Sequence, residues 1–330
     1  MGYSLNYMET LPKLFKDSLS KNASQNLFFD KKGDKWESLT YQEGRDKIEL
    51  VAMGLRSLGY AKGDRMAIQS ENRSEWTLSD YACAHFGYVS VAVYPTLLPS
   101  QVEYILSDSG SSLVFVSSRE QAEKVIGIKS KIATLKHMIV FDDEKFDEDW
   151  IMTYQELMNK GAEFKKGVDY TLEDEGEKIS KDDLWTLIYT SGTTGNPKGV
   201  MLTQFNIASN VQGTQAAVKF KENKTFLSFL PLSHSLERMG SHATFWIGST
   251  TWFAESVPQV PANMKEAKPH YMISVPRLYE KIFAKVQDGV ASASPLKQKI
   301  VKWAMATGSA TSKKYLQKAI EPKGLLGFKY

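Results

Sequence analysis

Apolar and polar residues alternate along the first 140 positions in two different patterns. Short apolar runs of the kind that form buried strands stand at Arg65–Ser70, Ser90–Pro95, Ser112–Ser117 and His137–Asp142. Between these runs, apolar residues recur every three or four positions, as they do on one face of a helix. Predicted strands and helices therefore alternate along the chain at the spacing of β-α-β units. This alternation predicts an α/β fold with a doubly wound, mostly parallel sheet.

The helices between these strands have recognisable ends. Thr40 and Glu43 form a capping box, the apolar positions that follow share one face as far as Leu58, and Gly59 ends the segment. The same spacing predicts three further helices, over Ser74–Gly87, Pro99–Asp108 and Arg119–Lys131.

The alternation resumes after an acidic region at residues 142–183, which is poor in apolar residues and predicts surface excursions rather than a domain boundary. The apolar run Leu184–Tyr189 then predicts a central parallel strand. Downstream, strands are predicted at Thr225–Leu230, Thr250–Glu255 and Tyr271–Pro276, and helices at about Arg238–Ile247 and from Arg277 onward. The last ten residues carry no closing helix or cap, so we expect the chain to stop short of the complete fold.

Composition excludes several classes of protein. The single cysteine, Cys83, rules out an internal disulfide and favours a reducing cytoplasm, and no apolar run is long enough to span a membrane. A net charge of +3 is too small to indicate a nucleic-acid partner. Residues 261–330 alone contain 13 Lys/Arg against 4 Asp/Glu. This excess predicts either a solvated basic surface or attraction to an acidic ligand or an anionic lipid.

A segment rich in glycine and hydroxyl residues, SGTTGNPKG, follows the apolar strand directly at residues 191–199. At the carboxyl end of a central strand, where open α/β sheets bind ligands, it suits an anion such as phosphate. Backbone amides, hydroxyls and one mobile charge would come from Thr190, Ser191, Gly192, Thr193, Thr194, Gly195, Lys198 and Gly199. The spacing is neither that of a Walker loop nor that of a dinucleotide turn. From composition alone, a flexible surface hairpin is an equal alternative.

The longer string YTSGTTGNPKGVMLTQFN resembles the phosphate-binding signature of the AMP-forming acyl-adenylating superfamily. Three other segments, Ser90–Val116, Phe229–Arg238 (FLPLSHSLER) and Ile273–Ile282, are similar to the long-chain fatty acid:CoA ligases of that superfamily. The resemblance extends from about Thr40 to Lys281. It implies the large N-terminal domain of the acyl-adenylating fold, with layered, mostly parallel sheets flanked by helices.

The resemblance also implies a two-step reaction that uses ATP, Mg²⁺ and coenzyme A. A fatty carboxylate attacks the α-phosphate of ATP to form an acyl-adenylate and pyrophosphate, and the thiol of coenzyme A then displaces AMP. The segment from Thr190 to Gly195, together with Lys198 and Gly199, would grip the β- and γ-phosphates. Lys198, Thr194 and His234 are the expected catalytic residues.

The string LPLSHSLER supplies the expected substrate pocket. The resemblance implies that His234 lies near the adenylate and the acyl entrance. There it would shape the site and form a hydrogen bond rather than act as a general base. Glu237 and Arg238 are expected beside it, although they could instead form an ordinary ion pair at a helix start. Some relatives carry an aromatic gate at the position of Arg238. The other four histidines lack metal-ligand spacing and are expected to be structural.

Family segments that carry a magnesium-binding glutamate, a ribose-binding aspartate, a hinge and a small C-terminal domain are not found before Tyr330. We therefore expect residues 1–330 to be an N-terminal AMP-binding domain truncated before its end, with no metal ligand of its own. Two alternatives to a fatty acid:CoA ligase stay open at this point. One is a fatty acyl-AMP ligase that loads a carrier protein, and the other is a non-catalytic fragment that binds a nucleotide or an acyl chain.

A last pattern concerns the basic region near the end of the chain. Leu296, Ile300, Trp303 and Ala304 recur at helical spacing, flanked by Lys297, Lys299 and Lys302. This pattern predicts either core packing or peripheral contact with anionic lipid at the inner membrane face. The pattern leaves the oligomeric state open.

Overall fold

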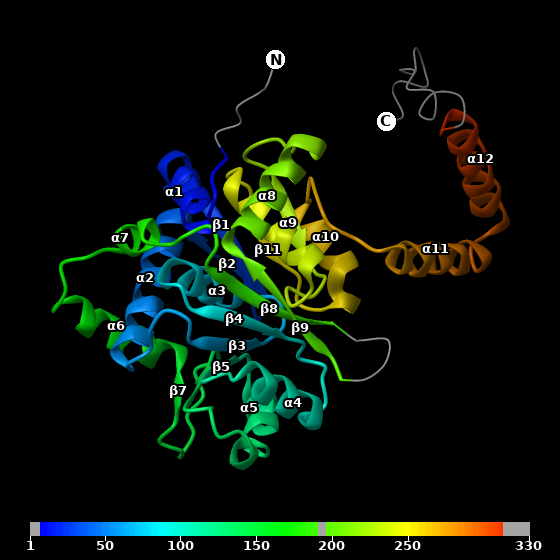
Figure 1. The fold of residues 1–330 in the computed structure, drawn as a ribbon. Helices are drawn as coiled ribbons and strands as arrows, with labels where there is room; N and C mark the ends of the chain where they lie inside the picture. The colour runs from blue at the N-terminus through cyan, green and yellow to red at the C-terminus, as the bar shows by residue number, and fades with distance from the viewer. Residues whose placement is uncertain (1–6, 191–195, 313–330) are drawn as a thin grey trace. The chain divides into compact units, whose positions relative to one another are not determined.

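The computed structural model describes residues 7–190 and 196–312 (Figure 1). The chain forms two compact units, Met1–Ile273 and Ser274–Tyr330. The first unit contains both sheets and most of the helices, and it holds every site residue predicted from the sequence.

The larger sheet of the first unit has seven strands in the order β7-β6-β5-β3-β4-β8-β9. Neighbouring strands are parallel, except that β8 and β9 form an antiparallel hairpin at one edge. The strands are β3 (Arg65–Gln69), β4 (Val89–Val93), β5 (Leu113–Val116), β6 (His137–Val140), β7 (Ile151–Thr153), β8 (Leu184–Thr190) and β9 (Lys198–Thr203). The predicted α/β class, with a mostly parallel sheet, is confirmed.

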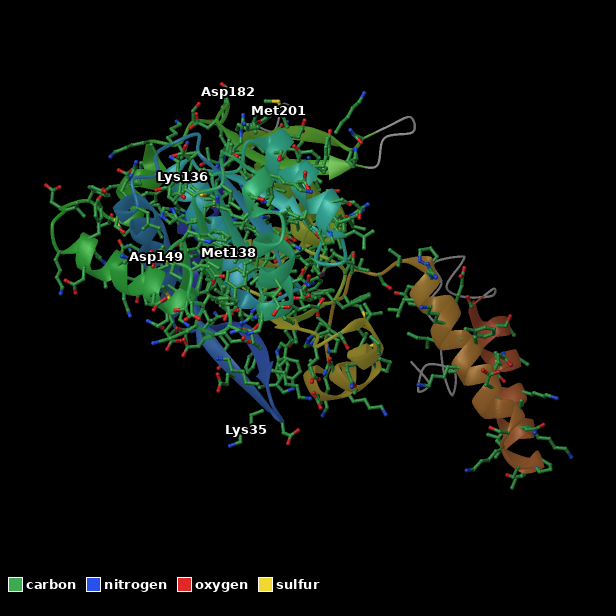
Figure 2. All side chains as sticks on the ribbon, turned by 90° about the horizontal axis from the view of Figure 1, so that it is seen from below. Lys35, Lys136, Met138, Asp149, Asp182 and Met201 are labelled. Atoms are coloured by element: carbon green, nitrogen blue, oxygen red, sulfur yellow. The ribbon has the colours of Figure 1, made fainter. Side chains whose placement is uncertain are left out.

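A second sheet has four strands in the order β10-β11-β1-β2. Its strands are β1 (Asn26–Lys32), β2 (Lys35–Thr40), β10 (Thr225–Ser228) and β11 (Thr250–Phe253). Strands β1 and β2 form an antiparallel hairpin that turns at Gly33, where φ is 58°, a conformation that favours glycine. Lys35 stands at the start of β2, near the tip of this hairpin (Figure 2).

Helices cover both faces of the seven-stranded sheet (Figure 1). The helices described in the first unit are α1 (Leu11–Asn22), α2 (Tyr41–Ser57), α3 (Ser74–Phe86), α4 (Pro99–Ser109), α5 (Arg119–Ile126), α6 (Tyr154–Lys165), α7 (Leu172–Glu177), α8 (Gln204–Val218), α9 (Ser235–Trp246) and α10 (Val260–Ala267), with short 3₁₀ turns at Lys129–Lys131 and Val257–Gln259. Helix α2 begins with the predicted capping box between Thr40 and Glu43.

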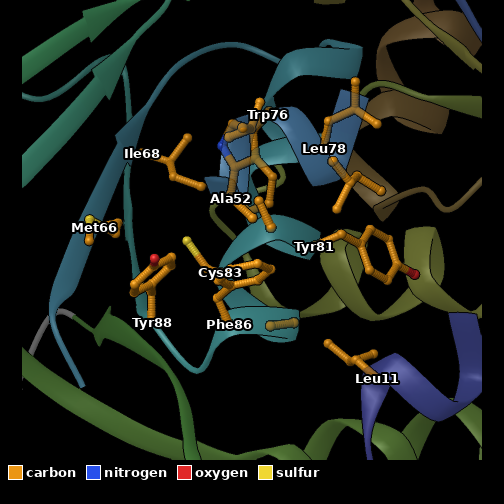
Figure 3. Close-up of a cluster of buried hydrophobic side chains, with 14 of the residues drawn as sticks. Leu11, Ala52, Met66, Ile68, Trp76, Leu78, Tyr81, Cys83, Phe86 and Tyr88 are labelled. Atoms are coloured by element: carbon orange, nitrogen blue, oxygen red, sulfur yellow. The ribbon is translucent and has the colours of Figure 1, made fainter. Parts of the chain in front are cut away.

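The two faces of the sheet bury separate apolar cores because successive side chains of a strand point to opposite faces. On β3, Met66 and Ile68 face α2 and α3, whereas Ala67 faces α4 and α5. Figure 3 shows the first of these cores, in which Trp76 and Tyr81 of α3 pack beside the buried Cys83. Helices on both faces are the doubly wound arrangement that the alternating pattern predicts.

Several predicted boundaries were wrong. The segment Tyr271–Pro276 is not a strand; it makes a single bridge, from Tyr271 to Phe226, before the next helix begins at Pro276. Helix α5 ends at Ile126, because Gly127 follows it, and α9 begins at Ser235 rather than at Arg238. The acidic region also contributes more than surface excursions, since it holds β7 at the sheet edge and the helix α6.

Helices α2 and α6 approach closely through glycines. A Cβ on Gly161 would lie 1.9 Å from the carbonyl oxygen of Leu50, and one on Gly54 would lie 2.4 Å from that of Leu157. Both obstacles are backbone atoms, which cannot rotate away as side chains do. The short apolar face of α6 is therefore held on α2 by the absence of side chains at these two positions.

Gly161→Ala is expected to destabilise the chain by about 3 kcal/mol, because the methyl group can be accommodated only by separating α2 from α6. Gly213→Ala on α8 is the matched control, since a Cβ there meets no atom within 4 Å. That substitution should stabilise the chain by about 0.5–1 kcal/mol through helix propensity. Urea unfolding of the two variants measures both effects, and equal midpoints would contradict the close contact.

As far as residue 312, the second unit consists of the helices α11 (Pro276–Ala291) and α12 (Pro295–Thr311). Apolar residues on both helices are exposed to solvent: Tyr279, Ile282, Phe283, Val286, Leu296, Ile300, Trp303 and Met305. Across residues 7–190 and 196–312, no helix combines the length and the apolar character that crossing a membrane requires.

Candidate functional site

The predicted phosphate loop joins β8 to β9. Thr190, the last residue of β8, pairs in register with Lys198, the first residue of β9, and both side chains are exposed. The two strands therefore deliver a hydroxyl and an ammonium group to the same end of the hairpin. The other predicted phosphate ligands of this loop lie outside the described residues: Ser191, Gly192, Thr193, Thr194 and Gly195.

A pocket of about 450 Å³ lies at the carboxyl ends of β4 and β8. These strands are parallel neighbours, with Ala92 opposite Ile188, so their ends reach the same edge of the sheet. The lining comes from both strands, from α4, from the hairpin and from the start of α9, and includes Tyr94, Gln101, Ile188, Tyr189, Thr190 and His234. Thr190 and His234, distant in sequence, thus face one cavity, where ligands of open α/β sheets bind.

His234 is held at the edge of this pocket by its own helix. It is the N-cap of α9, and its Nδ1 accepts a hydrogen bond from the backbone N–H of Leu236 at 3.2 Å. In the neutral ring this bond places the proton on Nε2. Nε2 is therefore the nitrogen that can donate a hydrogen bond to a ligand in the pocket.

Asn72 fixes the loop that leads to His234. Its side-chain amide donates to the carbonyl oxygen of Leu230 at 2.6 Å, and its side-chain oxygen accepts from the N–H of Leu232 at 2.9 Å. It also donates to the Ser228 hydroxyl at the end of β10. The sequence analysis missed this residue because no local pattern links Asn72 to a loop about 160 positions away.

Helix α4 is tied to the hairpin by two tyrosines. Tyr104 donates to the carbonyl oxygen of Pro197 at 3.0 Å, and Tyr189 donates to Asp108 at 2.6 Å. Burial and the nearby Asp108 raise the pKa of Tyr189, so the phenol stays protonated and donates. Gly199, predicted to bind phosphate, lies against the Tyr189 ring, and a Cβ on Gly199 would stand 3.1 Å from that ring. The absence of a side chain at Gly199 therefore lets β9 run close beneath that ring.

Glu237 and Arg238 are both buried, and neither lines the 450 Å³ pocket. The two residues do not form the alternative ion pair with each other, because Arg238 pairs with Asp80 of α3. Their assignment to an acyl pocket stays a prediction. Asp80 was not singled out from the sequence, since an acidic residue in the middle of α3 carries no signal of its distant partner.

Glu237 is an unusual buried acid. Its side chain is fully buried, and among the described residues neither carboxyl oxygen accepts a hydrogen bond of ordinary geometry, although the Ser228 hydroxyl and the Phe229 amide lie nearby. Burial raises the pKa of Glu237 to about 8, while the Ser228 hydroxyl and the Phe229 amide work in the opposite direction. The carboxyl is therefore mainly protonated at neutral pH.

The groups at this end of the hairpin are donors for an anion rather than ligands for a metal ion. Thr190, which lines the pocket, is an exposed hydroxyl donor, and its register partner Lys198 is an exposed cation, the kinds of group that phosphate oxygens bind. The residues that line the pocket include no carboxylate. In the part of the chain that the structure covers, no group of three or more His, Cys, Asp and Glu side chains could hold a metal ion.

The fold and the pocket define an α/β protein that binds its ligand at the carboxyl edge of a mostly parallel sheet, beside a hydroxyl-rich hairpin loop. The family model described as "AMP-binding enzyme" matches residues 15–323, and the chain belongs to that family.

Curated relatives carry the family likeness seen in the sequence. A long-chain-fatty-acid CoA ligase of Mycobacterium bovis, FadD15, is 31% identical over 261 residues, which cover 78% of this chain and 42% of the relative. The human long-chain-fatty-acid CoA ligase ACSBG2 is 29% identical over 320 residues, covering 95% and 48%. The resemblance stated from the sequence is confirmed, and the chain spans less than half the length of these relatives.

Solved structures share the fold. A long-chain-fatty-acid-CoA ligase of Archaeoglobus fulgidus, FadD1, has a TM-score of 0.73 at 21% identity, covering 87% of this chain and 56% of that one. The N-terminal domain of FACL13 from Mycobacterium tuberculosis has a TM-score of 0.68 at 23% identity, covering 82% and 64%. The fold is therefore that of the N-terminal domains of such ligases.

Proposed function

We propose that this chain is the front part of an enzyme that activates a long-chain fatty acid with ATP and transfers the acyl group to coenzyme A. The observation that carries the proposal is that Thr190 and His234 line one pocket at the sheet edge, with Lys198 paired opposite Thr190 on the neighbouring strand. The long-chain-fatty-acid CoA ligases to which the chain is similar support the choice of substrate.

The chemistry follows from the residues around the pocket. One oxygen of the fatty carboxylate forms a bond to the α-phosphorus of ATP, the bond from that phosphorus to the bridging oxygen breaks, and pyrophosphate leaves. Lys198 and Thr190, with the loop between them, stabilise the negative charge that gathers on the leaving phosphates. His234 donates from Nε2 to an oxygen of the reacting groups. Mg²⁺, which such reactions use, would share the neutralisation of the phosphates.

The apolar part of the pocket lies next to these polar groups. Ala92, Ile105 and Ile188 line it from β4, α4 and β8, and Leu97 lines it from the loop between β4 and α4. Such a wall would exclude water from the carboxylate and hold the first methylene groups of an acyl chain. We also propose that residues 1–330 form the front of the N-terminal AMP-binding domain, with the small C-terminal domain in the part of the relatives that this chain does not span.

Fatty-acid-dependent exchange of pyrophosphate into ATP tests the proposed first step on the purified 330-residue chain. Palmitate should support exchange and acetate should not, because only a long chain fills an apolar site. Exchange that is equally fast with both acids would contradict the long-chain assignment. Absence of exchange from a folded chain would contradict the claim that this part of the enzyme carries out adenylation.

We propose in addition that the second unit contacts anionic lipid at the inner face of the membrane, where fatty acids partition. On α12, the apolar residues Leu296, Ile300 and Trp303 are more than half exposed. The helix carries three basic residues and no acidic ones: Lys297, Lys299 and Lys302. An exposed apolar stripe flanked by lysines is typical of helices that lie in the lipid interface.

Vesicle co-sedimentation tests this contact. The chain should bind vesicles that contain phosphatidylglycerol and should be released by salt, since each lysine near such a surface contributes about 1 kcal/mol. Changing Lys297, Lys299 and Lys302 together to glutamate should abolish binding. The same change at Lys219, Lys221 and Lys224 of the first unit is the matched control. Equal binding to neutral phosphatidylcholine vesicles, unaffected by salt, would count against the proposal.

A further inference from the structure

A buried ionic cluster lies where α3, α9, β4 and β8 meet. Arg238 is 1% exposed and Asp80 is fully buried. Arg238 Nε donates to Asp80 Oδ2 at 2.9 Å, and Nη2 donates to Oδ1, so the guanidinium and the carboxylate form a two-pronged pair. The guanidinium carbon also lies 4.0 Å from the ring centre of Trp185 and 5.1 Å from that of Trp76.

The remaining donors of Arg238 attach α9 to the middle of the large sheet. Nη1 donates to the Thr186 hydroxyl at 2.8 Å, and Nη2 donates to the Ser90 hydroxyl at 2.6 Å. Thr186 in turn donates to the backbone carbonyl of Ser90 at 2.7 Å. Ser90 and Thr186 are register partners on β4 and β8, two positions before the pocket residues Ala92 and Ile188. The guanidinium therefore clamps the helix to both strands that form the pocket floor.

Neighbouring residues complete the cluster. His242, one turn further along α9, has Nε2 3.3 Å from Asp80 Oδ2, and its Nδ1 lies 3.0 Å from the Tyr81 hydroxyl. Burial lowers the pKa of His242, although Asp80 acts in the opposite direction, so the ring is neutral. Burial also works against the charge on Asp80, but Arg238 and His242 overcome it and keep the pKa of Asp80 below its usual range. The net result is one cation paired with one anion.

A gain in stability does not explain why such an ion pair is buried here. Removing two charges from water costs several kcal/mol per ion, and apolar residues of similar volume often stabilise a core as well or better. What the pair does supply is a directional constraint, because every donor of the planar guanidinium must point at its acceptor. Arg238 lies one helical turn after His234, and its backbone N–H donates to the His234 carbonyl at 3.2 Å. A constraint on Arg238 therefore reaches His234 through one hydrogen bond.

We propose that Asp80 and Arg238 are positioning residues that lock the start of α9 onto β4 and β8, and so hold His234 at the pocket beside Thr190. Neither residue touches the pocket. Their effect on the reaction rests on the proposed function, whereas their effect on the placement of α9 does not. The two effects can therefore be measured separately.

The decisive variant replaces the pair with apolar residues, Asp80→Val together with Arg238→Met. Hydrogen exchange at the amides of Leu236 and Arg238 reports the order at the start of α9, and urea unfolding reports stability. Arg45→Lys is the matched control, because Arg45 is also largely buried and pairs with Glu49 and Glu173, on α2 and α7, away from the pocket. The kinetic arm is the KM for palmitate and the kcat of ATP–pyrophosphate exchange.

We expect the double variant to unfold at or above the urea concentration of the parent chain, yet to lose exchange protection at Leu236 and Arg238. Its kcat/KM for palmitate should fall by about 100-fold, the effect of a misplacement of about 1 Å in a reacting site. Parent-like protection and kinetics in the double variant would overturn the proposal, as would an equal loss of protection in Arg45→Lys. If the parent chain catalyses no ATP–pyrophosphate exchange, the protection of the Leu236 and Arg238 amides from hydrogen exchange decides the positioning role alone.

A second, conservative variant tests the proposal even if the double variant does not fold. Arg238→Lys keeps the charge but cannot make the forked contacts to Asp80, Thr186 and Ser90 at once. It should fold, show partial loss of protection at Leu236, and leave the amides of α2 unchanged. Full protection at Leu236 in this variant would overturn the proposal whatever the behaviour of the double variant.

Discussion

Replacing Lys198 with alanine is expected to slow fatty-acid-dependent ATP–pyrophosphate exchange by about 100- to 1,000-fold, which corresponds to about 2.7–4 kcal/mol of transition-state stabilisation. The physical reason is the position of the ammonium group. Lys198 begins β9 directly opposite Thr190, at the end of the hairpin that meets the pocket. Negative charge that gathers on the leaving pyrophosphate would lose the ammonium group that Lys198 supplies at this end of the hairpin.

The same substitution should leave the fold intact, because the Lys198 side chain is exposed. Exposed substitutions of this kind change stability by less than about 0.5 kcal/mol. Lys35→Ala is the matched control, because Lys35 is an exposed lysine at the tip of the β1–β2 hairpin, in the other sheet. This variant should catalyse ATP–pyrophosphate exchange at the rate of the parent chain. A folded Lys198→Ala chain with undiminished exchange would remove Lys198 from the site.

Glu237→Gln is expected to make the chain more stable at alkaline pH. The pKa of Glu237 rises on folding from a reference value of 4.5 to about 8, so between these values the folded state holds a proton that the unfolded state has lost. Stability of the parent chain therefore decreases with rising pH, by about 1.4 kcal/mol per pH unit in the middle of this window. Glutamine is neutral throughout and removes that dependence.

Urea unfolding of both chains at several pH values measures the effect. The advantage of Glu237→Gln should grow by about 2 kcal/mol between pH 6 and pH 8. Glu222→Gln, which changes an exposed acid in the loop before β10, is the control and should follow the pH dependence of the parent chain. An advantage for Glu237→Gln that does not change with pH would show that Glu237 is ionised in the folded chain, or that its carboxyl is paired.

The sequence predicted the strands β3, β4, β5, β6 and β8 of the larger sheet because their signals are local, but it missed the edge strands β7 and β9. Each parallel strand is buried on both faces and therefore reads as an apolar run, and the capping box at Thr40 and Glu43 marks the start of α2. The β1–β2 hairpin was missed because its outer face is charged and half exposed, which weakens the apolar signal. The apolar segment Tyr271–Pro276 reads as a strand but pairs at only one residue, and pairing cannot be seen in a local pattern.

For the site, too, residues in local motifs could be predicted from the sequence, whereas residues that depend on distant partners could not. The glycine- and hydroxyl-rich loop and LPLSH are contiguous strings, so the sequence singles out Thr190, Lys198 and His234. The structure places Thr190 and His234 at one pocket and pairs Lys198 with Thr190 on the neighbouring strand. Asn72, Tyr104 and Asp80 could not be found, because each acts on a partner about 90 to 160 positions away. Arg238 was noticed for its place in a motif, but its partner and its burial required the folded chain.

The most direct test of the central claim is the search for an acyl-adenylate by mass spectrometry. The purified chain would be incubated with ATP, Mg²⁺ and palmitate in the absence of coenzyme A, with acetate and Lys198→Ala as parallel samples. We expect palmitoyl-AMP and an equal amount of pyrophosphate from the parent chain, no acetyl-AMP, and little product from Lys198→Ala. A folded chain that binds ATP but forms no palmitoyl-AMP, or that forms acetyl-AMP equally well, would contradict the proposed function.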